Sequence, residues 1–181
     1  MDPWISPHYR ASNFPGELSD FDRIDLFEDS IRGWHLDPAA RLAATDSQAG
    51  FAVLSIVMAY FETMAKYRGD SGDQTFAAGF TRALGSYFPD SESLQTAIDV
   101  LWKRVRNGLY HHTAVGDGIG LHPSNPADLP MWFADETLVI NVGGLVRALQ
   151  EDVSKYIREL RDPANHDLRA KFIARFDARP K

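Results

Sequence analysis

One long apolar segment places the strongest constraint on how this chain can fold. Between Asp46 and Lys66 only Glu62 carries a charge, and apolar side chains recur on nearly every side of a helix drawn over residues 47–67. A helix that is apolar all round needs neighbours on all sides, so the segment predicts a buried core helix surrounded by others. The uncharged run is shorter than the ~20 residues that a bilayer-spanning helix needs, and we therefore expect no membrane segment.

Further helices are predicted by apolar residues that recur every three or four positions. The first 18 residues contain three prolines, which lack the backbone donor that a helix needs, and they predict an extended or disordered arm. Asp37-Pro38 is typical of a helix start, with aspartate as the N-cap and proline at the first position. The predicted helices span 21–34, 37–45, 47–67, 74–87, 91–111 with Ser91 or Ser93 as its cap, 145–160, and a short basic segment after Pro163.

A short β element interrupts this helical pattern. Residues 138–142 form a β-branched run that predicts a strand, and its partner is either 119–121 or 131–133. We therefore expect an all-α protein: an up-and-down helical bundle with a small β-hairpin inserted before the last long helix. The expected boundaries are 1–18 for the arm, 19–181 for a single helical domain, about 45–160 for its core bundle and about 116–142 for the hairpin.

The composition excludes several classes of protein. The chain has no cysteine, so disulfides, thiolate metal sites and a cysteine nucleophile are ruled out. A net charge of −6 argues against an extended nonspecific nucleic-acid surface but leaves room for a small local site for RNA or a nucleotide. The N-terminus lacks the pattern of a signal peptide, and none of the six histidines has an established zinc spacing. We expect a cytoplasmic protein without a metal or cofactor.

Side chains that can carry chemistry gather at the end of the helix predicted at 91–111. Its core stripe consists of Leu94, Ile98, Leu101, Val105 and Leu109. At about 100° per residue, a polar patch falls on the opposite side, formed by Arg106, Asn107, Tyr110 and His111. His112 falls near the core stripe instead. The patch is either an ordinary solvated helix face or a site that a second surface completes.

The string Arg106-Asn107-Gly108-Leu109-Tyr110-His111 resembles the signature of the HEPN superfamily (higher eukaryotes and prokaryotes nucleotide-binding). That signature is an arginine, commonly followed by a polar residue, and then a histidine after four to six positions near a helix end. The layout of residues 45–160 is also similar, with the motif on a late core helix before one more long helix. The resemblance implies a metal-independent endoribonuclease that acts as a homodimer, in a toxin or defence setting with an antitoxin partner. The alternative that it implies is a catalytically inactive binding or dimerisation module.

The resemblance also implies roles for the motif residues. His111 acts as general acid or base, because an imidazole titrates near neutral pH. Arg106 stabilises charge on the phosphoryl oxygens, and Asn107 orients His111 or the phosphate. Tyr110 binds a phosphate, stacks on a base or packs at an interface. His112 either duplicates His111 or, because it falls near the core stripe, packs or caps the helix.

Glu62 requires a partner, because an isolated carboxylate in a buried helix is costly. Arg106 is one candidate, and Lys66, one turn further on, is another. Glu62 is then either a supporting residue that positions Arg106 in the site or half of a structural ion pair.

Overall fold

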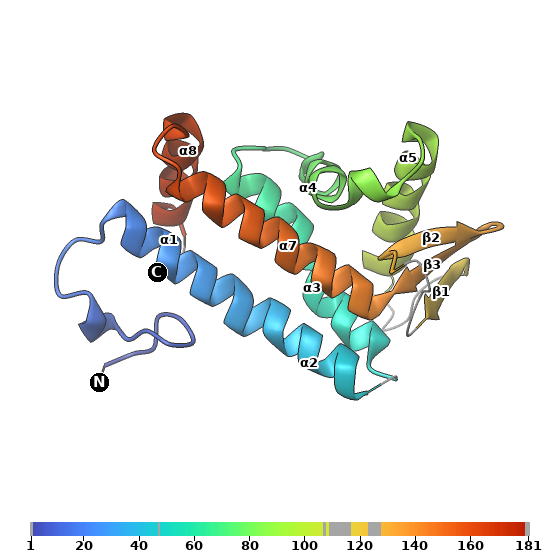
Figure 1. The fold of residues 1–181 in the computed structure, drawn as a ribbon, viewed down its shortest axis with the longest axis horizontal. Helices are drawn as coiled ribbons and strands as arrows, with labels where there is room; N and C mark the ends of the chain where they lie inside the picture. Colours follow the sequence, from blue (N-terminus) through green and yellow to red (C-terminus); the bar gives the residue numbers. More distant parts are fainter. Residues whose placement is uncertain (1, 47, 107, 109–116, 123–127, 180–181) are drawn as a thin grey trace.

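The computed structural model of the protein describes residues 2–46, 48–106, 108, 117–122 and 128–179. These residues are mostly helical, with one small sheet (Figure 1). The helices are α1 (Asp20–Ile31), α2 (Asp37–Thr45), α3 (Gly50–Tyr67), α4 (Thr75–Leu84), α5 (Ser91–Val100), α7 (Val142–Arg161) and α8 (His166–Asp177), and the strands are β1 (Ile119–His122), β2 (Met131–Ala134) and β3 (Thr137–Asn141).

Helix α3 is the element around which others pack, as its apolar sequence predicts. It contacts α2, α4, α7 and α8, and its side chains in the core include Val53, Leu54, Val57, Met58 and Phe61. The expectation of burial on every side is wrong, however. Phe51 is 43% exposed, and Ser55 and Ala59 are exposed as well. Because these three residues are four positions apart, one neutral face of α3 points outward.

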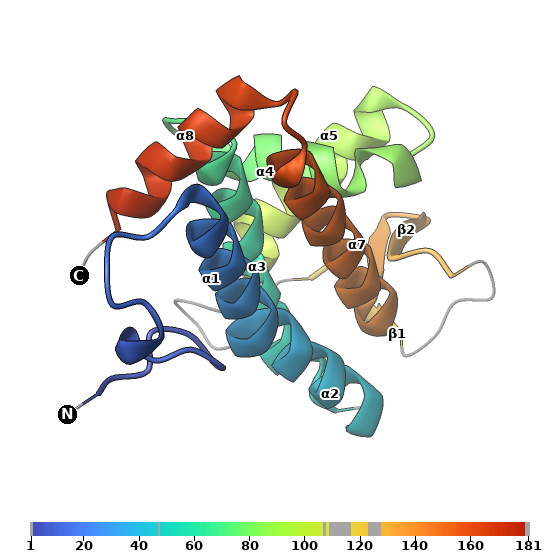
Figure 2. The same ribbon diagram turned by 60° about the vertical axis from the view of Figure 1, so that its left-hand side comes forward.

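The first two helices form one continuous rod, which corrects the helix start predicted at Asp37-Pro38. A π-helical segment, η2 (Arg32–Leu36), joins α1 to α2, and the rod lies alongside α7 (Figures 1 and 2). The Asp37 N–H donates to the Arg32 carbonyl, five residues earlier. This wider turn accommodates the Pro38 ring, which has no N–H and would crowd a regular α-helix.

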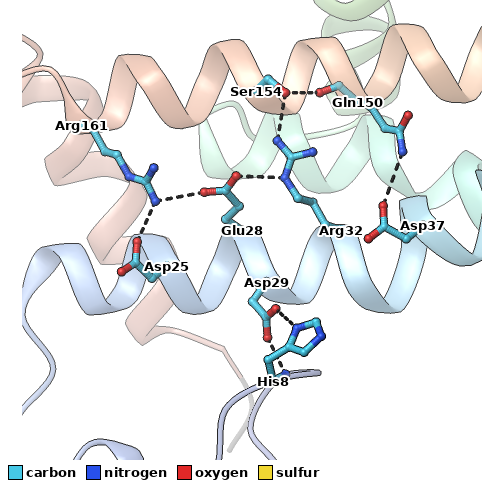
Figure 3. Close-up of polar contacts among 9 residues, drawn as sticks. All are labelled: His8, Asp25, Glu28, Asp29, Arg32, Asp37, Gln150, Ser154 and Arg161. Atoms are coloured by element: carbon cyan, nitrogen blue, oxygen red, sulfur yellow. Dashed lines mark hydrogen bonds and ion pairs between the residues drawn. The ribbon is translucent and has the colours of Figure 1, made fainter.

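A row of polar side chains joins this rod to α7 (Figure 3). Arg161 of α7 donates to Asp25 at 2.7 Å and to Glu28 at 3.0 Å. Arg32 donates to the other Glu28 oxygen and to Ser154 Oγ, both at 2.9 Å. We call these five residues the α1–α7 seam. Each arginine contacts two oxygen-bearing side chains, so the seam links the α1–α2 rod to α7.

The N-terminal arm folds back onto α1 (Figures 1 and 3). Ser6 Oγ donates to Asp29 Oδ2 at 2.5 Å, and the His8 N–H donates to the same oxygen at 2.9 Å. The His8 ring Nδ1 lies 2.6 Å from Asp29 Oδ1. Gly33 permits this approach, because a Cβ at that position would lie 2.6 Å from Pro7 Cγ. Asp29 therefore anchors the arm to its own chain.

The β element is a three-stranded sheet in the order β1-β3-β2, which corrects the expectation of a two-stranded hairpin. Strand β3 pairs antiparallel with β2 and parallel with β1, so both candidate partners of the 138–142 run are used. The chain passes directly from β3 into α7, where the Asn141 side chain accepts a hydrogen bond from the Gly144 N–H at 3.0 Å and caps the helix. The sheet thus lies at the start of α7, close to α5 (Figure 1).

Candidate functional site

The helix that leads to Arg106 has the predicted core stripe but not the predicted winding. Ile98, Leu101 and Val105 are buried, and Leu94 is half-buried against the core, so these four members of the stripe face inward. Residues Leu101–Arg106 form a π-helical segment, η4, in which each residue turns by less than the 100° of an α-helix. As a result, Arg106 does not point away from its neighbours as the ideal helix predicts, and its side chain reaches α3.

Arg106 is held between a carboxylate and an aromatic ring. Its Nη2 atom lies 2.9 Å from Glu62 Oε1 on α3, and its guanidinium carbon lies 4.2 Å from the centroid of the Trp102 ring. Lys66 Nζ lies 3.9 Å from Glu62 Oε2, so both candidate partners of Glu62 are used and Arg106 is the closer. The Arg106 and Glu62 side chains are 31% and 22% exposed, which places the pair at the edge of the surface. We call Arg106, Glu62, Lys66 and Trp102 the Arg106 cluster.

The contact between Arg106 and Glu62 is an ion pair rather than an aligned hydrogen bond. Glu62 Oε1 is shielded from solvent and accepts no well-directed hydrogen bond within the described ranges, although Arg106 Nη2 is 2.9 Å away. A shielded carboxylate oxygen depends on nearby positive charge. The pair therefore fixes the end of η4 against the middle of α3.

Trp102 is the residue of this cluster that sequence reasoning missed. It lies four positions before Arg106 on the same helix, a spacing that brings two side chains together and allows a cation–π contact. Its ring also packs against Phe76 of α4, with the ring centroids 5.2 Å apart. The Trp-x3-Arg spacing was the available signal, and it shows that Arg106 is supported by its own helix as well as by α3.

The structure brings together two of the six predicted site residues, Arg106 and Glu62. Asn107, Tyr110, His111 and His112 lie outside the described residues, so their places beside Arg106 stay predictions.

The exposed face of α3 leads up to the Arg106 cluster. Phe51, Ser55 and Ala59 succeed one another at four-residue spacing, and Glu62 follows three residues later on the same side. Ser55 Oγ donates to the Phe51 carbonyl at 2.9 Å, a bond within the helix that indicates no separate site at this serine. The candidate site is therefore a positioned arginine at one end of an exposed neutral helix face.

Two kinds of feature are not found in the part of the chain that the structure describes. Among the described residues, no three histidine, aspartate or glutamate side chains are grouped so that they could hold a metal ion. Over the same part of the chain, no helix has the length and apolar character to cross a membrane.

Comparison with known proteins identifies no relative. No family model, no curated protein and no solved structure matches this chain. The Arg106 cluster and the motif that contains Arg106 are the features of the chain that indicate a function.

Proposed function

We propose that this protein is a HEPN-like, metal-independent endoribonuclease that acts as a homodimer in a cytoplasmic toxin or defence setting. The observation that carries the proposal is the placement of Arg106, whose guanidinium Glu62 and Trp102 hold at the end of the motif helix. A positioned cation suits a phosphoryl transition state, because preorganised charge needs no rearrangement during the reaction. In this proposal the helices form an up-and-down bundle of the HEPN kind, and the sheet is an insertion into it.

The proposed reaction is cleavage of an RNA phosphodiester by side chains of the protein alone. His111 moves the proton of the attacking ribose 2′-hydroxyl or of the leaving 5′-oxygen. Arg106 binds the phosphoryl oxygens through its planar set of donors, and Asn107 orients His111 or the phosphate. Tyr110 contacts a phosphate or base. Glu62 is a positioning residue for Arg106, and His112 is a packed or capping residue.

The outward face of α3 supports a homodimer at this site. Phe51, Ser55 and Ala59 expose a neutral strip that ends at Glu62. In a two-fold dimer the same patch of both copies meets across the interface. Pairing through this strip brings two Arg106 clusters close together and supplies the second surface that an outward polar motif needs.

The same cluster also fits the alternative, a catalytically inactive dimerisation module. An arginine paired with a carboxylate and stacked on a tryptophan is a stable structural contact whether or not a substrate follows. The two proposals differ in what happens to RNA, not in the folded structure.

One experiment separates the two proposals: purified protein is incubated with RNA in excess EDTA. Cleavage that is lost in His111→Ala and in Arg106→Ala supports the ribonuclease. Arg158→Ala removes an exposed arginine of α7 and serves as the control that must retain cleavage. Intact RNA together with a stable dimer supports the inactive module. Cleavage that EDTA abolishes contradicts both.

A further inference from the structure

A polar groove of about 200 Å³ lies beside the Arg106 cluster, between the start of α4 and the middle of α5. Trp102, which is half-buried, forms its aromatic wall, and the buried ring of Phe76 packs against it. Each side of the groove also contributes one carboxylate and one carboxamide. These are Asp73 and Gln74 just before α4, and Asp99 and Gln95 on α5. The groove therefore combines flat apolar surface with hydrogen-bonding groups.

The groove and Arg106 lie along one face of one continuous helical segment. Gln95, Asp99 and Trp102 line the groove together, and the Arg106 guanidinium stacks on Trp102, so these side chains share one side. At no more than about 1.5 Å per residue, Asp99 lies about 10 Å or less from Arg106 along the helix axis. Gln95 Nε2 and Lys103 Nζ donate to the two Asp99 oxygens at 3.0 and 2.9 Å and hold that carboxylate in place. A phosphate at Arg106 and a neighbouring base in the groove fit this separation.

Charge changes sign along this face, from the guanidinium of Arg106 to the carboxylates of Asp73 and Asp99, the second of which is paired with the exposed Lys103. The lining of the groove itself contains two carboxylates and no cation, so it suits the uncharged base of a nucleotide whose phosphate lies at the arginine. Proteins bind unpaired RNA bases in this manner, with aromatic side chains against the base and polar groups at its edge.

The edge chemistry favours guanine among the four bases. Guanine presents two adjacent N–H donors beside a carbonyl oxygen, whereas the other bases present one donor on that edge. A carboxylate accepts from both guanine donors, and a carboxamide donates to its carbonyl oxygen. We infer that this groove binds a guanine base of single-stranded RNA next to the phosphate at Arg106. The inference rests on the proposed function for RNA as the ligand.

The test measures how the full chain binds RNA that cannot be cleaved. The 2′-O-methyl pentanucleotides UUGUU and UUAUU lack the attacking hydroxyl, so calorimetric titration reports affinity independently of catalysis. We expect the strand with guanine to bind at least about fivefold more tightly, and Asp73→Asn and Asp99→Asn each to remove most of that ratio. Glu92→Gln, which changes an exposed carboxylate of α5 that does not line the groove, is the control that keeps the ratio.

The outcomes distinguish this inference from the proposed function. Equal affinity for the two strands, no binding of either, or a ratio unchanged in both aspartate variants overturns the guanine subsite. RNA cleavage without a preference for guanine leaves the ribonuclease standing and removes the subsite. Guanine-selective binding that both aspartate variants lose, without any RNA cleavage, supports the subsite and contradicts the ribonuclease.

Discussion

The α1–α7 seam and the Arg106 cluster place the same kind of side chain in different surroundings. In the seam, Arg161 of α7 donates hydrogen bonds to two carboxylates of α1 (Figure 3). Arg32 donates to Glu28 of α1 and to Ser154 of α7. In the cluster, Arg106 stacks on Trp102 of its own helix and pairs with Glu62 of α3, beside a groove and an exposed helix face. The seam thus joins elements that already pack together, whereas the cluster positions a cation at the surface. We expect the seam to contribute mainly to stability and the cluster mainly to function.

Arg106→Ala provides the most sensitive test of this contrast. Removal of a preorganised donor to the phosphoryl group is expected to lower kcat for RNA cleavage about 10²- to 10³-fold. The free energy of unfolding should fall by about 1–2 kcal/mol, because the ion pair is partly exposed but the shielded Glu62 Oε1 loses its nearest cation. Arg106→Lys keeps the charge but not the planar fork of donors, so it should restore only part of the rate. Cleavage kinetics and urea unfolding measure the two quantities, and a large loss of stability with no specific loss of rate would remove the distinction.

Glu62→Gln tests whether the carboxylate acts through the position of Arg106. Because a small displacement of a catalytic group lowers the rate strongly, we expect kcat to fall about 10- to 100-fold. KM and the thermal midpoint should stay nearly unchanged. Lys66→Ala is the matched control, since it removes the more distant and more exposed partner of Glu62, and it should change kcat by less than about threefold. Equal effects of the two substitutions would indicate that local charge, not positioning, is responsible.

Phe51→Asp tests whether the exposed face of α3 supplies the second surface of the cluster. A charge in place of the largest apolar side chain of the strip should weaken dimerisation at least about tenfold, and cleavage should fall with it. Phe21→Asp changes another exposed phenylalanine, 54% exposed on α1, and should leave the dimer intact. Light scattering over a range of protein concentrations measures the association. A wild-type chain that is monomeric and active would contradict the dimer.

Arg32→Ala tests the seam itself. Its guanidinium bonds to Glu28 and Ser154 are lost, and we expect the free energy of unfolding to fall by about 1–2 kcal/mol. The kcat per folded molecule should not change. Arg41→Ala, an exposed arginine of α2, is the control for loss of charge alone. A specific loss of activity in Arg32→Ala would show that the two regions are coupled.

Asp29→Asn, which changes the residue that anchors the arm, is expected to have the smallest effect of these substitutions. Burial raises the pKa of this carboxyl, but hydrogen bonds from His8 and Ser6 outweigh it and keep the pKa below its ordinary value of 3.8. A carboxylate with a depressed pKa stabilises the fold above its unfolded-state pKa, and that contribution is lost as pH falls through the folded-state pKa. Asp29→Asn should therefore lower the urea midpoint at pH 7, and its difference from wild type should shrink below pH 3.8. A difference that grows on acidification would contradict this role for the carboxylate.

Features that depend on local spacing were predictable from the sequence. Most of the apolar side chains of α3 and the stripe of Ile98, Leu101 and Val105 are buried, because apolar residues recur there at helical intervals. The need of Glu62 for a cation was equally clear, since a single carboxylate in such a segment is costly by itself. Both of its candidate partners are in fact near it.

Features that depend on changes of winding or on distant pairing were not predictable. The signals at Asp37-Pro38 describe a helix start, but the π turn before them lets the rod continue. Asp90, rather than Ser91 or Ser93, caps α5. The sequence could not distinguish them, because all three residue types are good N-caps and they lie within four positions. The segments of β1 and β2 were both predicted as partners of the 138–142 run, but the sequence offered them as alternatives and did not show that β3 pairs with both.

The π-helical winding of Leu101–Arg106 makes the candidate site sensitive to chain length rather than only to side-chain identity. Deleting one residue while the wide winding stays would rotate Arg106 by slightly less than about 100° relative to α5 and carry it away from Glu62. A return of the segment to the α-helical pitch at its full length would rotate Arg106 in the opposite sense. The two changes together nearly cancel, because six residues of the wider turn cover about the same rotation as five residues of an α-helix. Sequences of this kind that differ here by a single-residue insertion or deletion should therefore keep the site only where the winding changes with the length.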